Sequence, residues 1–224
     1  MKTFRIENQL KLKNSQVISQ GNRQFVYQNP DDPNTLLKVP QPHTTNGQAN
    51  LVTDSWFDRK FRRSTTYKGF LREFHESFDL MVRFQNRSDP IPVCEVRGVL
   101  QTDIGIALVY ERISDPDGQL SPSLQELAES GRLTPHHLDC LDKHFDELIE
   151  AKVLVSNKNT RNIVFQTFPD GSGRWVWIDS FGSKQIVPVR RWFQFLNRRK
   201  INQIRERFMG VAEDALRRSA ERGS

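Results

Sequence analysis

Cysteine is nearly absent from this chain of 224 residues, which contains only Cys94 and Cys140. The two residues are far apart, and neither belongs to a closely spaced cysteine and histidine group of the kind that holds a structural zinc ion. Two isolated cysteines also cannot form the dense disulfide framework of small secreted domains. We therefore expect two free thiols in a reducing compartment.

Long apolar runs are missing as well. No stretch approaches the roughly 18 apolar residues of a membrane-spanning helix. The first residues, MKTFRIENQLKLK, mix charged and apolar side chains and lack the apolar segment of a signal peptide. Because hydrophobic residues still make up 36% of the chain and include 15 Phe, the composition predicts a globular core. The expected location is the cytoplasm.

Acidic residues are absent from one segment that otherwise has the form of a functional loop. Residues 153–166, VLVSNKNTRNIVFQ, contain two short apolar runs around a polar loop with three asparagines and two cations. The apolar runs predict a hairpin. The loop contains neither the carboxylate nor the histidine that usually serves as a general base.

Positive charge is concentrated near the C-terminus. The formal net charge is +6, and residues 185–224 hold ten Lys or Arg against four Asp or Glu, which accounts for the whole excess. Within this region, VPVRRWFQFLNRRKINQIRERF interleaves cations with aromatic residues. Two interpretations stay open: a segment that binds nucleic acid or an anionic surface, or an amphipathic helix with its aromatics inward and its arginines outward.

The first half of the chain is predicted to be rich in strands. Alternating apolar residues and turn clusters predict a three-stranded antiparallel meander and two later strands. These strands are expected at Leu12–Ile18, Gln24–Tyr27, Thr35–Val39, Val93–Gln101 and Gly105–Arg112. One helix is expected between them at Tyr67–Phe84, with an apolar stripe formed by Phe70, Leu71, Phe74, Phe78 and Met81.

The second half is predicted to be mainly helical. It follows the linker SDPDGQLSPS, whose turn residues mark a boundary. Thr134 is the expected N-cap of a long helix that has Pro135 at its first position and ends near Ala151. The other expected elements are a helix at Ser123–Glu129, strands at Ile163–Thr167 and Trp175–Asp179, and helices at Arg190–Gly210 and Val211–Arg222.

The order of these elements resembles that of a protein-kinase-like fold. The resemblance implies an α+β fold with a β-rich N-lobe at about 1–113, a hinge at about 114–122, a mainly helical C-lobe at about 123–210 and a basic C-terminal tail at about 211–224. Residues 15–210 are also similar to the YrbL family of bacterial cytoplasmic proteins. The pieces that carry this similarity are FLREFHESF, GVLQTDIGIALVYERISDPDG, NIVF and WIDSFGSKQIVPV.

The kinase-like resemblance implies a site for ATP and Mg²⁺. In such a site a glycine loop, here with Gly21, covers the phosphates, and a strand lysine, here Lys38, binds them and pairs with a helix glutamate, here Glu73. The resemblance assigns Asn162 and Asp179 as the metal ligands. The family name implies a link to the PhoP regulatory network.

Each assignment has an ordinary structural alternative. Lys38 could be a solvated charge at a strand end, and Glu73 a surface residue of its helix. Asn162 could cap a turn, and Asp179 could be a turn residue that follows its strand.

Three departures from the kinase pattern argue against an efficient protein kinase. The glycine loop has one glycine, and the metal triplet reads Asp-Ser-Phe-Gly with an extra residue. The catalytic His-Arg-Asp pattern is missing, and the position of its aspartate falls on Asn157, whose amide cannot take a proton at neutral pH. The sequence therefore favours a pseudokinase or a weak phosphotransferase. A small-molecule kinase with another base stays open.

The main alternative is a binding module without catalysis that acts through its basic C-terminal segment. The predicted partners are a nucleotide and a protein that the sequence does not identify, with nucleic acid less favoured and no membrane span. A metal site at His136, His137 and His144 is not indicated, because adjacent histidines point to different sides of a helix. We expect a solvated helix start there.

Overall fold

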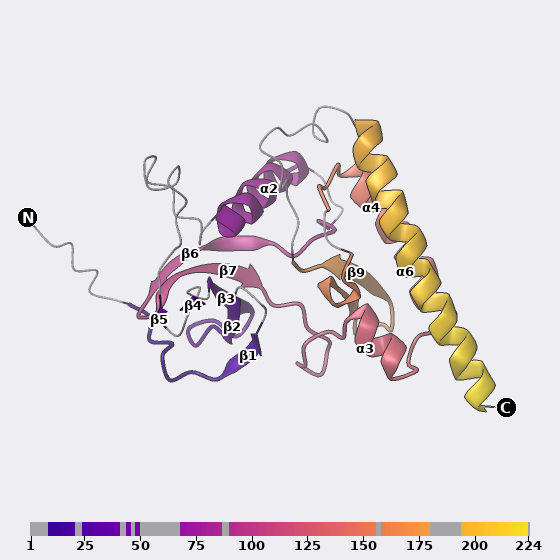
Figure 1. Cartoon of the computed structure of the whole chain (residues 1–224), viewed down its shortest axis with the longest axis horizontal. Helices are drawn as coiled ribbons and strands as arrows, with labels where there is room; N and C mark the ends of the chain where they lie inside the picture. Colours follow the sequence, from indigo (N-terminus) through magenta and orange to yellow (C-terminus); the bar gives the residue numbers. More distant parts are fainter. Residues whose placement is uncertain are drawn as a thin grey trace, which may run out of the picture. The chain divides into compact units, whose positions relative to one another are not determined.

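The chain folds into two compact units of mixed α+β structure (Figure 1). The computed structural model describes residues 9–20, 24–40, 44–45, 48–49, 68–86, 90–155, 158–179 and 194–223. Unit 1 comprises Met1–Leu71 and Glu95–Arg112, and unit 2 comprises Arg72–Cys94 and Ile113–Ser224. An antiparallel sheet dominates the N-terminal part and helices dominate the C-terminal part. The kinase-type lobes and hinge stay a prediction.

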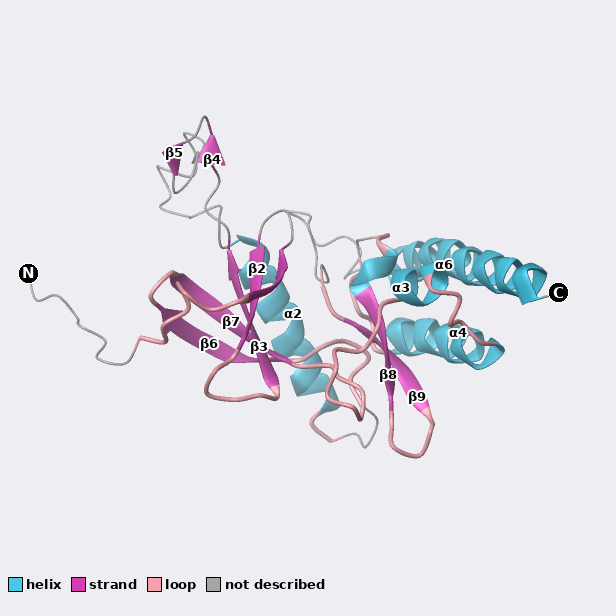
Figure 2. Ribbon diagram, turned by 90° about the horizontal axis from the view of Figure 1, so that it is seen from below, coloured by secondary structure: helices cyan, strands magenta, loops and turns pink. Residues whose placement is uncertain are grey.

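Unit 1 is built on a five-stranded antiparallel sheet in the order β1-β2-β3-β7-β6 (Figure 2). The strands are β1 (Val17–Gln20), β2 (Gln24–Gln28), β3 (Thr35–Pro40), β6 (Val96–Thr102) and β7 (Gly105–Glu111). This sheet confirms the predicted meander and the two later strands. A separate short pair, β4 (Thr44–Thr45) with β5 (Gln48–Ala49), forms a second antiparallel sheet.

The first strand begins later than predicted. Leu12 is fully buried, but its backbone N–H donates to the Asp103 carboxylate at 2.6 Å, and the N–H of Lys13 donates to the same carboxylate at 3.3 Å. A side chain therefore replaces a neighbouring strand as the acceptor for this segment. Strand pairing with β2 starts only at Val17.

Alternate residues of β3 lie on opposite faces of the sheet, with core residues of unit 1 on one face and a buried lysine on the other. Leu37 and Val39 join the hydrophobic core with Leu12, Tyr27 and Ala107. Successive side chains of a strand point to opposite faces of the sheet. Lys38, which pairs with Val26 and Leu108, consequently lies on the face opposite this core.

Unit 2 combines helices with a short hairpin. Its elements are α2 (Lys68–Phe84, in this unit from Arg72 on), α3 (Leu124–Glu129), α4 (Pro135–Glu150), the 3₁₀ turn η1 (Thr160–Asn162), β8 (Ile163–Thr167), β9 (Gly173–Trp177) and α6 (Gln194–Gly223). Thr134 caps α4 as predicted, with Pro135 at the first turn. Ser123 and Glu126 form a reciprocal capping box at the start of α3.

The core of unit 2 joins α4, α6 and the hairpin. Trp177 of β9 stacks on Phe208 of α6 with ring centroids 5.6 Å apart, and Phe208 meets Phe145 of α4 edge to face. Arg205 of α6 reaches Asp142 and Asp146 of α4 at 2.5 and 2.8 Å. The two predicted C-terminal helices form one helix of 30 residues, because its buried stripe continues past Gly210 to Ala212 and Ala215.

Only part of the predicted apolar stripe of α2 is buried, because Phe70 is buried and Phe74 is half-buried. Leu71, Phe78 and Met81 are exposed. The buried face of the helix consists of Phe70, Glu73, Glu76, Ser77 and Leu80. The hydrophobic period therefore identified the helix correctly but not its orientation.

Candidate functional site

The hairpin β8–β9 brings two predicted site residues to one end. Its strands pair in register from Ile163 with Trp177 to Thr167 with Gly173. One step further, the backbone N–H of Ile178 donates to the carbonyl of Asn162 at 2.9 Å. The indole N–H of Trp177 donates to the carbonyl of Asp179 at 2.8 Å. Asn162 therefore lies opposite Ile178, the residue before Asp179, at the same end of the hairpin.

The side chain of Asn162 is not a turn cap. That role belongs to Asn159, whose side-chain oxygen accepts the N–H of Arg161 at 3.1 Å. Asn162 is only 7% exposed, and among the described residues its Nδ2 has no hydrogen-bond partner. Buried amides normally have partners, so an unpaired one calls for an explanation.

Arg161, one of the two cations of the loop, forms a hydrogen bond within unit 2. Its guanidinium Nε donates to the side-chain oxygen of Gln125 at 3.1 Å, and the hydroxyl of Thr160 reaches the same oxygen at 3.4 Å. Gln125 lies on α3, so this contact fixes the loop to that helix. Lys158 is exposed. Asn157, the residue at the predicted base position, lies outside the described residues, as does Gly21.

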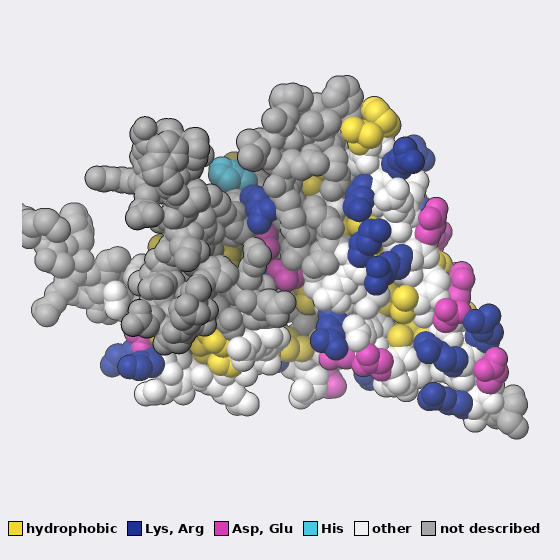
Figure 3. All heavy atoms as spheres, viewed as in Figure 1, with side chains coloured by type: hydrophobic (Ala, Val, Ile, Leu, Met, Phe, Trp, Pro, Cys, Tyr) yellow, Lys and Arg dark blue, Asp and Glu magenta, His cyan; other side chains and the backbone are white. Residues whose placement is uncertain are grey.

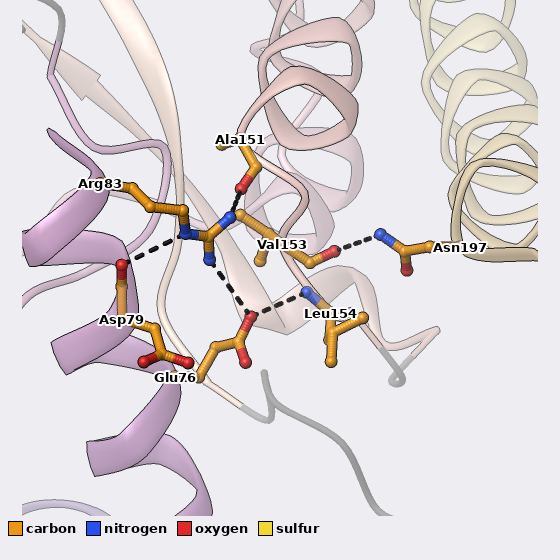
Figure 4. Close-up of polar contacts among 7 residues, drawn as sticks. All are labelled: Glu76, Asp79, Arg83, Ala151, Val153, Leu154 and Asn197. Carbon is orange, nitrogen blue, oxygen red and sulfur yellow. Dashed lines mark hydrogen bonds and ion pairs between the residues drawn. The ribbon is translucent and has the colours of Figure 1, made fainter. Parts of the chain in front are cut away.

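Side chains of α2 and α6 clamp the backbone that leads into this loop (Figure 4). The buried carboxylate of Glu76 accepts the N–H of Leu154 at 3.3 Å and lies 4.0 Å from the guanidinium of Arg83. Arg83 donates in turn to the carbonyl of Ala151. From α6, the amide of Asn197 donates to the carbonyl of Val153 at 2.9 Å.

The clamp formed by Glu76, Arg83 and Asn197 surrounds a strained turn. Lys152, just after α4, has a φ of 54° and is the one residue other than glycine in the described parts of the chain with a positive φ. Glycine usually occupies this position at a helix end. The three backbone contacts of the clamp hold the chain on both sides of this turn, at Ala151 before it and at Val153 and Leu154 after it. Nothing in the sequence pattern signalled Glu76 and Arg83 as a pair, although two acids, Glu73 and Glu76, lie on one face of the helix.

Glu73 and Lys38 are both buried, which excludes their ordinary alternatives as solvated residues. Glu73 lies on α2 one turn before Glu76, in the same unit as Asn162 and Asp179. Lys38 lies in unit 1, where its Nζ is 4.1 Å from the centroid of the Tyr110 ring. A cation over an aromatic face is stabilised by the ring quadrupole.

The histidines of α4 do not form a metal centre. In the described part of the chain, no three His, Cys, Asp or Glu side chains are close enough to hold an ion. His136 and Cys140, four residues apart, approach to 3.5 Å, a pairing that a search for histidine pairs alone overlooks. Burial, the largest effect, raises the pKa of the Cys140 thiol, so this thiol is not an activated nucleophile.

Thr134, Pro135 and His136 at the start of α4 are exposed, as expected, whereas His137 is half-buried and His144 lies further along the helix. Burial, with the nearby His136 and Arg132, lowers the pKa of His137, whose Nδ1 accepts the N–H of Thr134 at 3.1 Å as part of the cap of α4. His144 is fully buried, and burial, reinforced by Arg174, lowers its pKa to about 3. Both are neutral structural residues of α4.

None of the helices in the described ranges is long and apolar enough to span a membrane.

Comparison with known proteins identifies the family. The family model for PhoP regulatory network protein YrbL matches residues 10–212. The chain is 22% identical over 210 residues to uncharacterized protein YrbL of Escherichia coli (strain K12), and the match covers 92% of this chain and 89% of that protein. It has the same identity and coverage with uncharacterized protein YrbL of Shigella flexneri. Because the family model spans most of the sequence, the chain belongs to the family of PhoP regulatory network protein YrbL.

Proposed function

We propose that this protein is a bacterial regulatory protein with a nucleotide site of protein-kinase type, and that it works as a pseudokinase or a weak phosphotransferase. The observation that carries the proposal is the end of the β8–β9 hairpin, where the buried Asn162 lies opposite Ile178, the residue before Asp179. In protein kinases a loop Asn and a later Asp hold Mg²⁺.

The donor set fits Mg²⁺. An amide oxygen from Asn162 and a carboxylate from Asp179 are hard oxygen ligands, and Mg²⁺ in nucleotide sites is typically held by one or two protein ligands together with phosphates and water. A site of this kind needs no group of three acidic or histidine side chains. The bound ion would neutralise phosphate charge, and the two residues would orient it.

The side chains of Lys38 and Glu73 are of the type that the same proposal requires. A buried ammonium is suited to bind phosphate oxygens, and a buried carboxylate on a helix is suited to hold such an ammonium. Both side chains are shielded from water, which strengthens any charge interaction they make.

The turnover expected of such a site is slow. With Asn157 at the base position, no side chain of the loop can accept the proton of a hydroxyl substrate. General-base catalysis typically contributes about 10²–10⁴-fold. Positioning and charge stabilisation remain, and they account for most of phosphoryl-transfer catalysis.

Thermal unfolding with ATP and Mg²⁺ tests the nucleotide site. A ligand present at about 100 times its Kd stabilises the folded state by about 2.7 kcal/mol, so the wild type is expected to melt at a higher temperature. Lys38→Met and Asp179→Asn should lose this shift. Asp170→Asn is the matched control, because Asp170 lies in the exposed turn at the opposite end of the same hairpin.

Two results would contradict the nucleotide site. One is a wild-type protein that ATP and Mg²⁺ do not stabilise. The other is a Lys38→Met variant that they stabilise as much as the wild type.

A second candidate function, binding of a polyanion through α6, is favoured by one specific surface. Phe195, Arg198, Arg199, Asn202 and Gln203 follow one another along one face of the helix and line a shallow depression together with Glu206. Figure 3 shows Lys and Arg side chains gathered over the first part of α6. Arginines beside an exposed aromatic ring suit a nucleic acid strand.

The same helix is less suited to a membrane surface. Its apolar stripe, which includes Ile201, Ile204 and Phe208, is already buried in the core of unit 2. An interfacial helix needs such a stripe free to enter the lipid. Salt-dependent binding to a labelled single-stranded oligonucleotide, but not to anionic vesicles, is the expected result. Absence of oligonucleotide binding at low salt would exclude this function.

A further inference from the structure

The loop that leads to Asn162 is held at its start by side chains of α2 and α6. The buried carboxylate of Glu76 accepts the N–H of Leu154 at 3.3 Å, and the amide of Asn197 donates to the carbonyl of Val153 at 2.9 Å. Val153 and Leu154 lie outside any helix or strand. Because regular secondary structure does not fix their direction, these side-chain contacts do.

The same loop is held at its end by one side chain of α3. The side-chain oxygen of Gln125 accepts the Nε–H of Arg161 at 3.1 Å and lies 3.4 Å from the hydroxyl of Thr160. Its amide nitrogen donates to the carboxylate of Glu129 at 2.6 Å, which leaves the oxygen free to face the loop. Asn162 follows Arg161 directly in the chain, so Gln125 restrains the position of Asn162.

The two ends of the loop are mechanically linked. Val155 and Lys158 are three residues apart, so their Cα atoms lie within about 11 Å of each other. Val153 and Val155 from the start of the loop and Ile163 from its end belong to one hydrophobic core, that of unit 2. A shift at the start of the loop is therefore transmitted to its end.

We infer that Glu76 and Gln125 are positioning residues, through which α2 and α3 set the Mg²⁺ affinity of the proposed nucleotide site. The inference rests on that proposed function, because Asn162 and Asp179 are the metal ligands in it. Removal of a side chain that orients the ligands of a metal typically lowers the metal affinity about 10–100-fold. A displacement of α2 that breaks the Glu76 contact would lower the Mg²⁺ affinity in the same way.

Hydrogen exchange without nucleotide tests whether these contacts restrain Asn162. The N–H groups of Asn162 and of Phe168, which lies at the other end of the β8–β9 hairpin, are both hydrogen-bonded to backbone carbonyls close by in the chain. Glu76→Ala and Gln125→Ala should each accelerate exchange at Asn162 but not at Phe168. A general loss of stability would instead accelerate exchange at both.

Titration of ATP binding with Mg²⁺, at a temperature where every variant is folded, tests the link to the site. Glu76→Ala and Gln125→Ala should each raise the half-saturating Mg²⁺ concentration about 10–100-fold, whereas ATP binding in EDTA should stay as in the wild type. Glu76→Gln retains an oxygen acceptor and should stay close to the wild type. Glu213→Ala, which removes an exposed glutamate from α6, is the matched control and should behave like the wild type.

Failure of the positioning role differs from failure of the proposed function. A wild type that does not bind ATP with Mg²⁺ contradicts the proposed function, and the exchange at Asn162 still tests the contacts of Glu76 and Gln125. Unchanged exchange at Asn162 in both alanine variants overturns the positioning role. An unchanged Mg²⁺ requirement of both variants, beside a wild type that binds, overturns it as well.

Discussion

At the residue scale, the two most informative side chains are buried polar groups that lack hydrogen-bond partners in the described structure. The Nδ2 of Asn162 lies at the end of the hairpin that also carries Asp179, and as an N–H donor it is suited to an anionic oxygen rather than to a metal ion. His144 lies in the middle of α4, with neither ring nitrogen hydrogen-bonded in the described structure. The Glu147 carboxylate, 3.8 Å from its Nδ1, is 44% exposed. The cost of burying a charged imidazolium therefore exceeds its attraction to the Glu147 carboxylate, and the His144 ring stays neutral.

His144 makes stability depend on pH. Its pKa is about 3 in the folded chain and about 6.5 when unfolded, so the unfolded state binds the proton more tightly. Stability is complete above pH 6.5 and falls as pH drops toward 3. At pH 4 the loss from this group is about 3 kcal/mol. Denaturant unfolding should show that His144→Leu loses less stability between pH 7 and pH 4 than the wild type. Equal losses would contradict this account.

At the element scale, the clamp on residues 151–154 determines how the loop begins. Glu76 and Arg83 of α2 and Asn197 of α6 reach three backbone groups of this short segment (Figure 4). The N–H groups of Ala151 to Val153 are bonded to the last turn of α4, and the side chains supply partners for the backbone groups that this turn leaves over.

Removing the Glu76 carboxylate should loosen this segment. In Glu76→Ala the N–H of Leu154 loses its acceptor, and an unsatisfied buried donor costs about 1–3 kcal/mol. Hydrogen exchange at Leu154 should accelerate, and denaturant unfolding should show the loss of stability. Glu76→Gln retains an oxygen acceptor and should lose less. Glu213→Ala, which removes an exposed glutamate from α6, is the control; unchanged exchange at Leu154 in Glu76→Ala would refute the role of the clamp.

The turn at Lys152 gives a stabilising substitution. A left-handed conformation costs a residue with a Cβ roughly 1–2 kcal/mol, and glycine offsets part of that gain through its greater freedom in the unfolded chain. Lys152→Gly should therefore raise the free energy of unfolding by about 0.5–1 kcal/mol. Lys152→Ala keeps the Cβ and should bring no gain. The two variants are compared by urea unfolding, and equal stabilities would argue against strain at this turn.

At the scale of the whole molecule, the sequence predicted the elements better than their orientation. Turn residues and caps such as Thr134 are local signals, and they located the meander, α3, α4 and the hairpin. The inward face of α2 is determined by long-range contacts of Glu76, and apolar periodicity points to the opposite face. Of the candidate site, the placement of Asn162 and Asp179 at one end of the hairpin follows from its two strands. The clamp could not be predicted, because it joins residues nearly 80 positions apart.

The distribution of charge along the chain leads to the last prediction. Residues 185–210 hold seven cations and one acid, whereas residues 211–224 hold three cations and three acids. The whole excess of +6 therefore lies ahead of the predicted basic tail. The structure adds that Arg217 pairs with Asp214 at 2.6 Å, while Arg198 and Arg199 line the exposed face near Phe195. Only the first part of α6 has the charge to bind a polyanion.

Replacing two arginines at one end of α6 or at the other distinguishes the effect of where the charge lies from the effect of net charge. If single-stranded nucleic acid binds the first part, the double variant Arg198→Gln and Arg199→Gln should bind more weakly. The slope of log K against log salt should fall by about 1.4, because each lost contact with a single strand removes about 0.7. The double variant Arg217→Gln and Arg218→Gln removes the same charge from the neutral end and should retain the wild-type slope. Equal slopes for the two double variants would show that affinity follows net charge alone and that the face around Phe195 has no special role.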